Sequence, residues 1–107
     1  MASVYVSIGS NINREHHIAE SLKALRNRFK PLTISSFYDC EPVGFEGDNF
    51  LNLVVGFECS LRVGELAKVL QQIELDSGRQ RENKEWASRT LDIDILLYDN
   101  KVALSTG

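Results

Sequence analysis

The chain has 107 residues, the length of one ordinary domain, of which 43% are hydrophobic and 25% charged. Its formal net charge is −3, which argues against a general nucleic-acid binder, because such proteins carry an excess of Lys and Arg. Cys40 and Cys59 are too few for a disulfide framework and lack metal-type spacing, so we expect reduced thiols in a cytoplasmic protein. No signal-like segment opens the chain, and no apolar run approaches the roughly 20 residues that span a bilayer, so we expect no membrane partner.

The N-terminal third of the chain predicts a strand followed by a helix. Residues 3–8 alternate apolar, mostly β-branched side chains with others, which favours a strand, and Gly9 begins the turn that breaks it. Asn11 or Asn13 can cap the following helix, and Pro31 ends it. One stripe of this helix is apolar and consists of Ile18, Leu22, Leu25 and Phe29.

The middle of the chain predicts two further strands separated by a loop. Residues 32–38 indicate the second strand, and residues 39–49, with one Pro and two Gly, are typical of a loop. Residues 50–60 indicate the third strand, in which Gly56 is a candidate β-bulge.

The C-terminal part predicts a second helix and a fourth strand. Apolar residues at helical spacing form one face of the helix, namely Leu66, Val69, Leu70 and Ile73. Gly78 suits the end of this helix, and the polar residues 79–88 separate it from a strand over residues 89–98. After a turn, residues 101–104 can start a fifth strand.

The predicted order is strand, helix, strand, strand, helix, strand. This order predicts an α+β fold of the ferredoxin-like split β-α-β type: a four-stranded antiparallel sheet with two helices on one face. We expect a single domain over residues 1–107. The fold hosts many functions, so the function has to be argued from particular residues.

The stretch RTLDIDILLY places two carboxylates in a strand that is otherwise apolar. Since strand side chains alternate between faces, Asp92 and Asp94 share one face, roughly 6.6 Å apart along the strand. We expect the opposite face, toward the helices, to carry Leu91, Ile93, Ile95 and Leu97. A Mg²⁺ ion between the carboxylates would remove their mutual repulsion, and its other ligands would be substrate phosphates. The alternative is that both Asp residues only solvate the open face of the sheet.

The segment before this strand is rich in cations, namely Arg79, Arg81, Lys84 and Arg89. Arginine side chains present a planar fork that suits phosphate oxygens, so metal and guanidinium groups together indicate a nucleoside triphosphate site. The alternative is a solvated loop whose cations pair with Glu82 and Glu85. Trp86 lies in the same segment and would then be tucked into the core.

Several motifs together resemble the 6-hydroxymethyl-7,8-dihydropterin pyrophosphokinase family of folate biosynthesis. RTLDIDILLY, preceded by IELDSGRQRENKEWAS, is the specific one, and VSIGSN, SSFYDCEPVG and FLNLVV support it in the family's order. The resemblance covers essentially the whole chain. It implies ATP-dependent transfer of pyrophosphate to the hydroxymethyl group of the pterin, with release of AMP. ATP, the pterin and two Mg²⁺ ions are the implied ligands.

The resemblance also implies a role for particular residues. Asp92 and Asp94 would hold the metal ions, and the implied catalytic residues are Arg79, Arg89, Asp92 and Asp94. The implied nucleotide-binding residues are Glu74, Arg81, Trp86, Arg89 and Ile95. The implied pterin-binding residues are Gly9, Cys40, Val43, Phe50 and Asn52. Phe50 offers an aromatic face to a flat heterocycle, and Asn52 offers a donor and an acceptor.

The sequence departs from the family at its C-terminal end, where the chain stops at KVALSTG. We therefore expect a C-terminally short form, with a homo-oligomer through the uncovered sheet as a possible assembly. One alternative is a catalytically impaired or inactive relative that only binds nucleotide or pterin. A second alternative is an RNA-binding module, but the acidic balance and the lack of paired stacking aromatics on the strands count against it.

Overall fold

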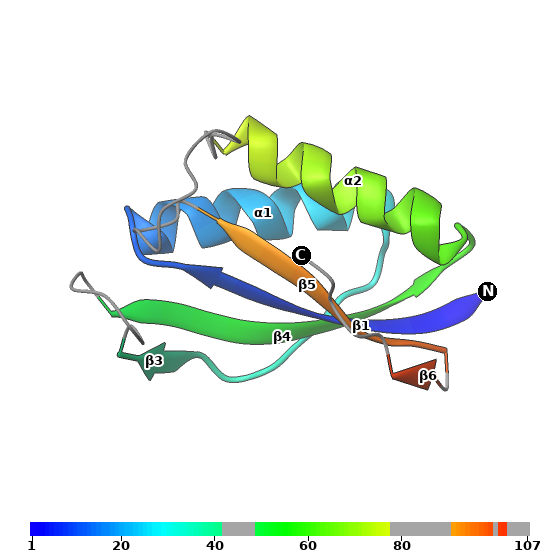
Figure 1. Cartoon of the computed structure of the whole chain (residues 1–107), viewed down its shortest axis with the longest axis horizontal. Coiled ribbons are helices and arrows are strands. Elements are labelled where there is room, and N and C mark those ends of the chain that lie inside the picture. Colours follow the sequence, from blue (N-terminus) through cyan, green and yellow to red (C-terminus); the bar gives the residue numbers. More distant parts are fainter. Residues whose placement is uncertain (42–48, 78–90, 100, 103–107) are drawn as a thin grey trace.

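The computed structural model describes residues 1–41, 49–77, 91–99 and 101–102 of the chain (Figure 1). The elements in chain order are β1 (Ala2–Ser10), α1 (Arg14–Arg28), β2 (Thr33–Ile34), β3 (Tyr38–Cys40), β4 (Phe50–Cys59), α2 (Val63–Asp76), β5 (Asp92–Tyr98) and β6 (Lys101–Val102). The predicted end of the second helix at Gly78 lies outside the described residues, as do the expected loop over residues 79–88 and residues 103–104 of the expected fifth strand.

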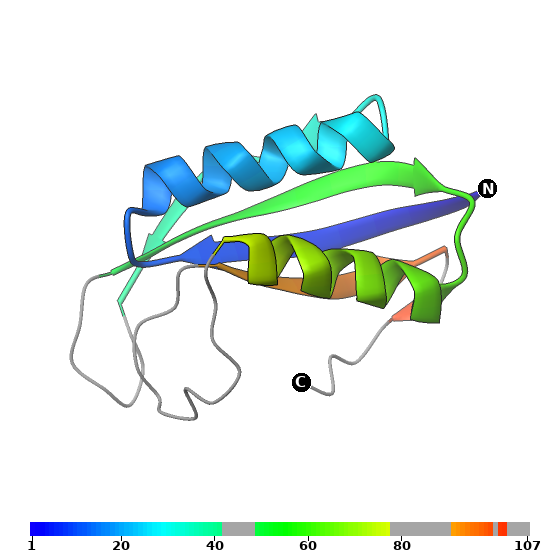
Figure 2. The same ribbon diagram turned by 90° about the horizontal axis from the view of Figure 1, so that it is seen from above.

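The strands form one antiparallel sheet in the order β2-β4-β1-β5-β6, and β3 also pairs with β4. Both helices cover the same face of the sheet, and the other face is left open by the described elements (Figure 1). Seen from above, α1 and α2 run side by side over the strands (Figure 2). The prediction of an α+β, ferredoxin-like arrangement is confirmed, with the second strand divided into β2 and β3 and the short strand β6 following β5.

The core lies between the helices and the sheet. Its strand residues face the helices alternately along β1, β4 and β5, as pleating requires. Phe29 and Phe57 stack at its edge with ring centroids 4.5 Å apart. The buried hydrophobic side chains are Val4, Val6, Ile8, Ile18, Leu25, Phe29, Leu53, Val55, Phe57, Cys59, Leu66, Leu70, Ile73, Leu91 and Ile93.

The two helices follow their predicted apolar stripes. Asn13 occupies the N-cap of α1 in the left-handed conformation, with φ 45°, which Asn tolerates better than most residues. Its carbonyl accepts a 3.0 Å hydrogen bond from His17 N–H and so starts the helix. Asn11, the other candidate cap, is buried instead. Within the described residues, no helix is long and apolar enough to cross a membrane.

The predicted second strand over residues 32–38 was wrong in its extent. It is divided into β2 and β3, and β3 continues to Cys40, inside the predicted loop. The division begins at Ser35, whose hydroxyl accepts a 2.8 Å hydrogen bond from Val54 N–H while its own backbone N–H donates to the Val54 carbonyl at 2.9 Å. A side-chain oxygen that accepts a hydrogen bond from the neighbouring strand interrupts the regular backbone pairing. Strand structure resumes three residues later, at Tyr38.

The expected β-bulge at Gly56 was also wrong. The β1–β4 register is continuous through the Tyr5–Gly56 pair. A Cβ on Gly56 would lie 2.7 Å from Tyr5 Cε1, so the glycine makes room for the ring of its cross-strand partner.

The irregularity in the sheet lies instead between Tyr5 and Val6, in the β1–β5 pairing. The register passes over Leu96, so the residues of β5 after Ile95 face the opposite side of the sheet from the one that strict alternation predicts. The side chain of Leu96 is 39% exposed. Leu97 pairs with Tyr5 and so faces away from the helices, against expectation, while Tyr98 packs against the core in its place. In the first strand, pairing continues through Ser10, so the turn at Gly9 begins later than predicted.

Candidate active site on the open face of the sheet

Asp92 and Asp94 lie on the open face at the start of β5. Their neighbour Ile93 is buried in the core, whereas both Asp residues are half-buried on the other side of the strand. The register places Asp92 opposite Gly9 and Asp94 opposite Ser7 on β1. The sequence-based prediction that the two carboxylates share one face is confirmed by this register.

The predicted pterin-binding residues gather on the same face across β1. Gly9 pairs with Asn52 on one side and with Asp92 on the other, so these three residues form one row across the sheet. Neighbouring strands are about 4.8 Å apart, so Asn52 and Asp92 lie roughly 10 Å apart by backbone. A Cβ on Gly9 would overlap Asn52 Oδ1 and would lie 3.8 Å from Phe50 Cδ1. The absence of a side chain at Gly9 therefore leaves room for the Asn52 amide over β1.

Strand β3 extends this row. Tyr38 pairs with Asn52, and Cys40, an exposed free thiol, pairs with Phe50. Tyr38 is 54% exposed and lies on the open face beside the amide. Sequence reasoning did not single out Tyr38, nor Ser7 opposite Asp94, since only the strand pairing shows which residues flank the candidate site.

Two predicted nucleotide-binding residues lie on the other side of β5. Glu74, in the last turn of α2, is 7% exposed, and its carboxylate accepts a 2.7 Å hydrogen bond from Ile93 N–H. Ile95 is partly buried against the core. The structure therefore brings Glu74 and Ile95 to the helix-facing side of β5, and Asp92 and Asp94 to its open side. By donating to Glu74, the Ile93 N–H at the outer edge of the strand is occupied.

The remaining predicted site residues lie outside the described residues. They are Val43, Arg79, Arg81, Trp86 and Arg89. Their assignments remain predictions from the sequence.

The donor set on β5 fits a magnesium ion shared with a phosphate-bearing substrate. Carboxylate oxygens are hard ligands, and Mg²⁺ is usually held by one or two carboxylates together with substrate phosphates and water. Among residues 1–41, 49–77 and 91–99, no group of three or more His, Cys, Asp or Glu side chains is arranged to hold a metal. In the described part of the chain, the Asp pair thus matches a metal site completed by its substrate, rather than a cage made of protein ligands alone.

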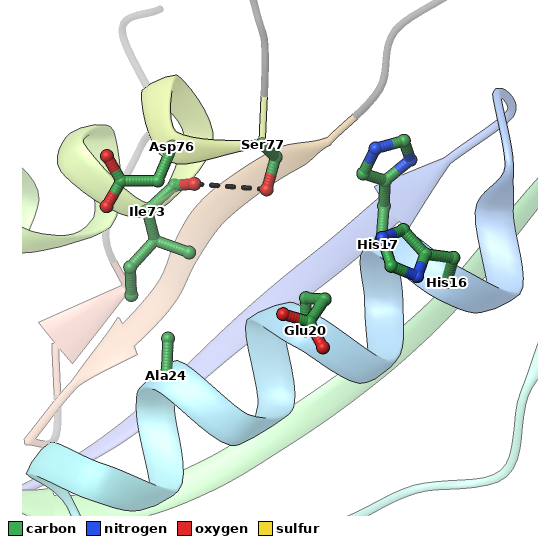
Figure 3. A pocket seen from close by; sticks show the side chains of 7 residues that line it. All are labelled: His16, His17, Glu20, Ala24, Ile73, Asp76 and Ser77. Carbon is green, nitrogen blue, oxygen red and sulfur yellow. Dashed lines mark hydrogen bonds between the residues drawn. The ribbon is translucent and has the colours of Figure 1, made fainter.

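A separate hollow of about 250 Å³ lies in the helix layer, between α1 and the C-terminal end of α2 (Figure 3). It is lined mainly by His16, His17, Glu20, Ile73, Asp76 and Ser77. The Ser77 hydroxyl donates to the Ile73 carbonyl at 3.1 Å, and His17 Nδ1 lies 2.7 Å from the Ile12 carbonyl. None of the residues predicted for the active site lines this hollow.

The fold and the site together define an α+β domain whose open sheet face carries paired carboxylates beside an amide and an aromatic ring. The family model of 7,8-dihydro-6-hydroxymethylpterin-pyrophosphokinase matches residues 5–105. The chain is 40% identical over 102 residues to the 2-amino-4-hydroxy-6-hydroxymethyldihydropteridine pyrophosphokinase of Bacillus subtilis, and 39% identical over 103 residues to that of Porphyromonas gingivalis. The chain belongs to this pyrophosphokinase family.

The relatives are longer than this chain. The matched segment covers 91% of the chain but 60% of the Bacillus subtilis protein. It covers 92% of the chain and 70% of the Porphyromonas gingivalis protein. For the Aquifex aeolicus pyrophosphokinase, 38% identical over 104 residues, the shares are 95% and 64%.

Proposed function

We propose that the protein transfers pyrophosphate from ATP to the hydroxymethyl group of 6-hydroxymethyl-7,8-dihydropterin. One observation carries the proposal: the row Asn52–Gly9–Asp92 puts a carboxylate pair next to an amide and an aromatic ring on one open face. The names of the matched relatives support the choice of substrates. In the reaction, the hydroxymethyl oxygen attacks the β-phosphorus and its proton is released to solvent. The bond from the β-phosphorus to the oxygen that bridges it to the α-phosphorus breaks, and AMP leaves with that oxygen.

The pterin side of the site consists of Phe50, Asn52 and Gly9, with Cys40 and Val43 as further proposed contacts. Phe50 stacks against the flat ring, and Asn52 hydrogen-bonds its amide-like edge with both donor and acceptor. Gly9 carries no side chain, so the Asn52 amide extends over the backbone of β1 and meets the edge of the ring there. This arrangement fixes where the hydroxymethyl group meets the phosphate chain, and such positioning is a large part of catalysis in phosphoryl transfer.

Asp92 and Asp94 would hold the metal on the phosphate side of the proposed site. Two bound Mg²⁺ ions would neutralise the phosphate oxygens and align the attacking and leaving oxygens. The carboxylates hold a fixed separation because both sit on a paired strand rather than on a loop. Arg79 and Arg89 are the proposed catalytic cations, and Arg81 and Trp86 the proposed further nucleotide contacts.

Glu74 and Ile95 suggest where the base of the nucleotide lies. Both are on the helix-facing side of β5, and among the described residues the outer edge of β5 pairs with β6 only at Leu97 and Tyr98. A nucleotide that contacts Ile95 on one side of β5 and Asp92 on the other therefore passes around the outer edge of β5, near Ile93. We place the base on the helix side and the phosphates on the open side.

The test is AMP formation from ATP at millimolar Mg²⁺, with and without the reduced hydroxymethylpterin. We expect AMP that depends on both the pterin and Mg²⁺. Well-folded protein that binds both ligands by calorimetry but forms no AMP would instead establish the alternative, a binding protein without turnover. A protein that binds neither ligand would overturn both functions.

A further inference from the structure

Arg14, the first residue of α1, joins three segments of the chain. Its Nη2 donates a 2.9 Å hydrogen bond to Asp39 Oδ2 on β3, and its Nη1 donates a 3.1 Å bond to the backbone carbonyl of Asn49, just before β4. Its Nε also lies 3.9 Å from the Glu15 carboxylate. One guanidinium thus connects the start of a helix to β3 and to the residue just before β4.

The register shows why this contact concerns the proposed pterin site. Tyr38 pairs with Asn52 and Cys40 pairs with Phe50, whereas Asp39, between them, pairs with Leu51. Because side chains alternate, Tyr38 and Cys40 lie on the open face and Asp39 on the helix side. Arg14 therefore holds β3 from the side opposite the site.

Strand β3 needs such support because its own pairing is short. It has three residues, all exposed, and it pairs with β4 at the edge of the sheet. Pairing over three residues supplies only a few backbone hydrogen bonds, which offset little of the conformational entropy lost when the strand is ordered. The bonds from Arg14 add an anchor that does not depend on the ladder.

The charge on Asp39 makes this anchor effective at neutral pH. The hydrogen bond from Arg14, with a second one from the Asn49 side chain, lowers the pKa of Asp39 below its ordinary value. The side chain of Arg14 is 28% exposed and that of Asp39 is 51% exposed. A surface pair of this kind adds little to global stability, so its main effect is local.

We propose that Arg14 is a positioning residue for the pterin, acting through Asp39 and Asn49 to hold β3 in register beside Asn52 and Phe50. This inference rests on the proposed function. It assigns a role to an ion pair on the helix side of β3, opposite the face that carries the proposed pterin site.

The test compares Arg14→Met with Arg28→Met, a control at the exposed other end of the same helix. We expect Arg14→Met to raise the KM for the pterin about three- to tenfold, the loss expected for one displaced ligand hydrogen bond. The KM for ATP and kcat should stay unchanged, as should all three constants in Arg28→Met. Arg14→Lys keeps the charge but not the planar fork, so it should restore part of the pterin affinity.

Two further readouts separate this inference from the proposed function. Hydrogen exchange of the β3 amides should speed up in Arg14→Met and in Asp39→Asn, while the β1 amides keep their protection. Equal rises in the KM for ATP and for the pterin, or an unchanged pterin KM with faster exchange in β3, would overturn the positioning role. A wild-type protein that forms no AMP would refute the proposed reaction instead, and pterin affinity by calorimetry would then decide the role of Arg14.

Discussion

The two faces of the sheet use the same strands for different purposes. On the helix-facing side, β1 contributes Val4, Val6 and Ile8 to the core. On the open side, β1 contributes Ser7 and Gly9, which stand opposite Asp94 and Asp92. Adjacent residues of one strand thus belong either to the packing that keeps the domain folded or to the candidate site.

This contrast shows how a small domain can carry charged residues in a strand that also contributes to its core. Pleating puts Asp92 and Asp94 on one side of β5 while Leu91 and Ile93 are buried on the other. The apolar neighbours fix the strand, and the strand then fixes the spacing of the carboxylates. Substitutions on the two faces should therefore have separable effects.

The largest expected effect is on the open face. Asp92→Asn and Asp94→Asn keep the size of each side chain but remove the negative charge that would bind the metal in the proposed function. We expect each to lower kcat for pterin-dependent AMP formation by at least about a hundredfold, as loss of one group that stabilises transition-state charge typically does. The free energy of unfolding in urea should change by no more than about 1 kcal/mol, because neither carboxylate belongs to the apolar core.

Normal AMP formation by both Asp variants would refute the metal assignment. If the variants lost activity because they unfolded, the carboxylates would instead be needed for the stability of the fold. The two faces of the sheet would then not have separate roles. Mg²⁺ titration of the residual activity adds a direct check, since a weakened metal site should require more Mg²⁺ for half-maximal rate.

Much of the helix-facing side could be predicted from the sequence. The apolar spacings of Ile18, Leu25 and Phe29, and of Leu66, Leu70 and Ile73, each describe a helical stripe, and all six residues are buried. Such periodic patterns follow from local geometry and need no knowledge of the partner element. The split of the second strand at Ser35 escaped prediction because it depends on a hydrogen bond to Val54, 19 positions away.

The candidate site was predictable in part. The spacing of Asp92 and Asp94 sufficed to put them on one face, and the family resemblance indicated Gly9, Phe50 and Asn52. The row across the sheet could not be read from the sequence, because register depends on long-range pairing. For the same reason, the shifted alternation that turns Leu97 to the open face and Tyr98 to the core was missed.

A second experiment uses neighbouring residues of β4 to sharpen the contrast. Leu53 is 1% exposed in the core, and Asn52 lies on the open face. We expect Leu53→Ala to lower the free energy of unfolding by about 2–5 kcal/mol, through lost burial and a cavity. Asn52→Ala should change that free energy little but weaken pterin binding. Urea denaturation measures the free energy of unfolding, and calorimetry measures pterin binding. If both variants mainly lose stability, the two faces of the sheet do not have separate roles.

A third, smaller effect is expected at Gly9. In Gly9→Ala the new methyl group would overlap Asn52 Oδ1, so the amide has to move, which a flexible side chain does at little cost to the fold. We expect the pterin KM to rise about three- to tenfold, the effect of one displaced hydrogen bond, with the KM for ATP unchanged. Gly64→Ala in α2 is the matched control, because a Cβ there meets nothing within 4 Å. A pterin KM equal to that of the control would show that Asn52 does not bind the pterin.

The smallest expected effect concerns the ionisation of Asp39 on the helix side of β3. The hydrogen bonds from Arg14 and then from Asn49 lower the pKa of Asp39 below its ordinary value of 3.8, so the folded state favours the ionised carboxylate. The resulting contribution to the free energy of unfolding is present when the pH is above the ordinary pKa of the carboxyl. It is lost as the pH falls through the lowered pKa of the folded state. The difference in unfolding free energy between wild type and Asp39→Asn should therefore shrink as the solution is acidified. Carboxyl ¹³C shifts titrated in wild type and in Arg14→Met test the cause directly: the pKa of Asp39 should rise toward its ordinary value in the variant, and an unchanged pKa would mean that Arg14 does not hold this carboxylate in solution.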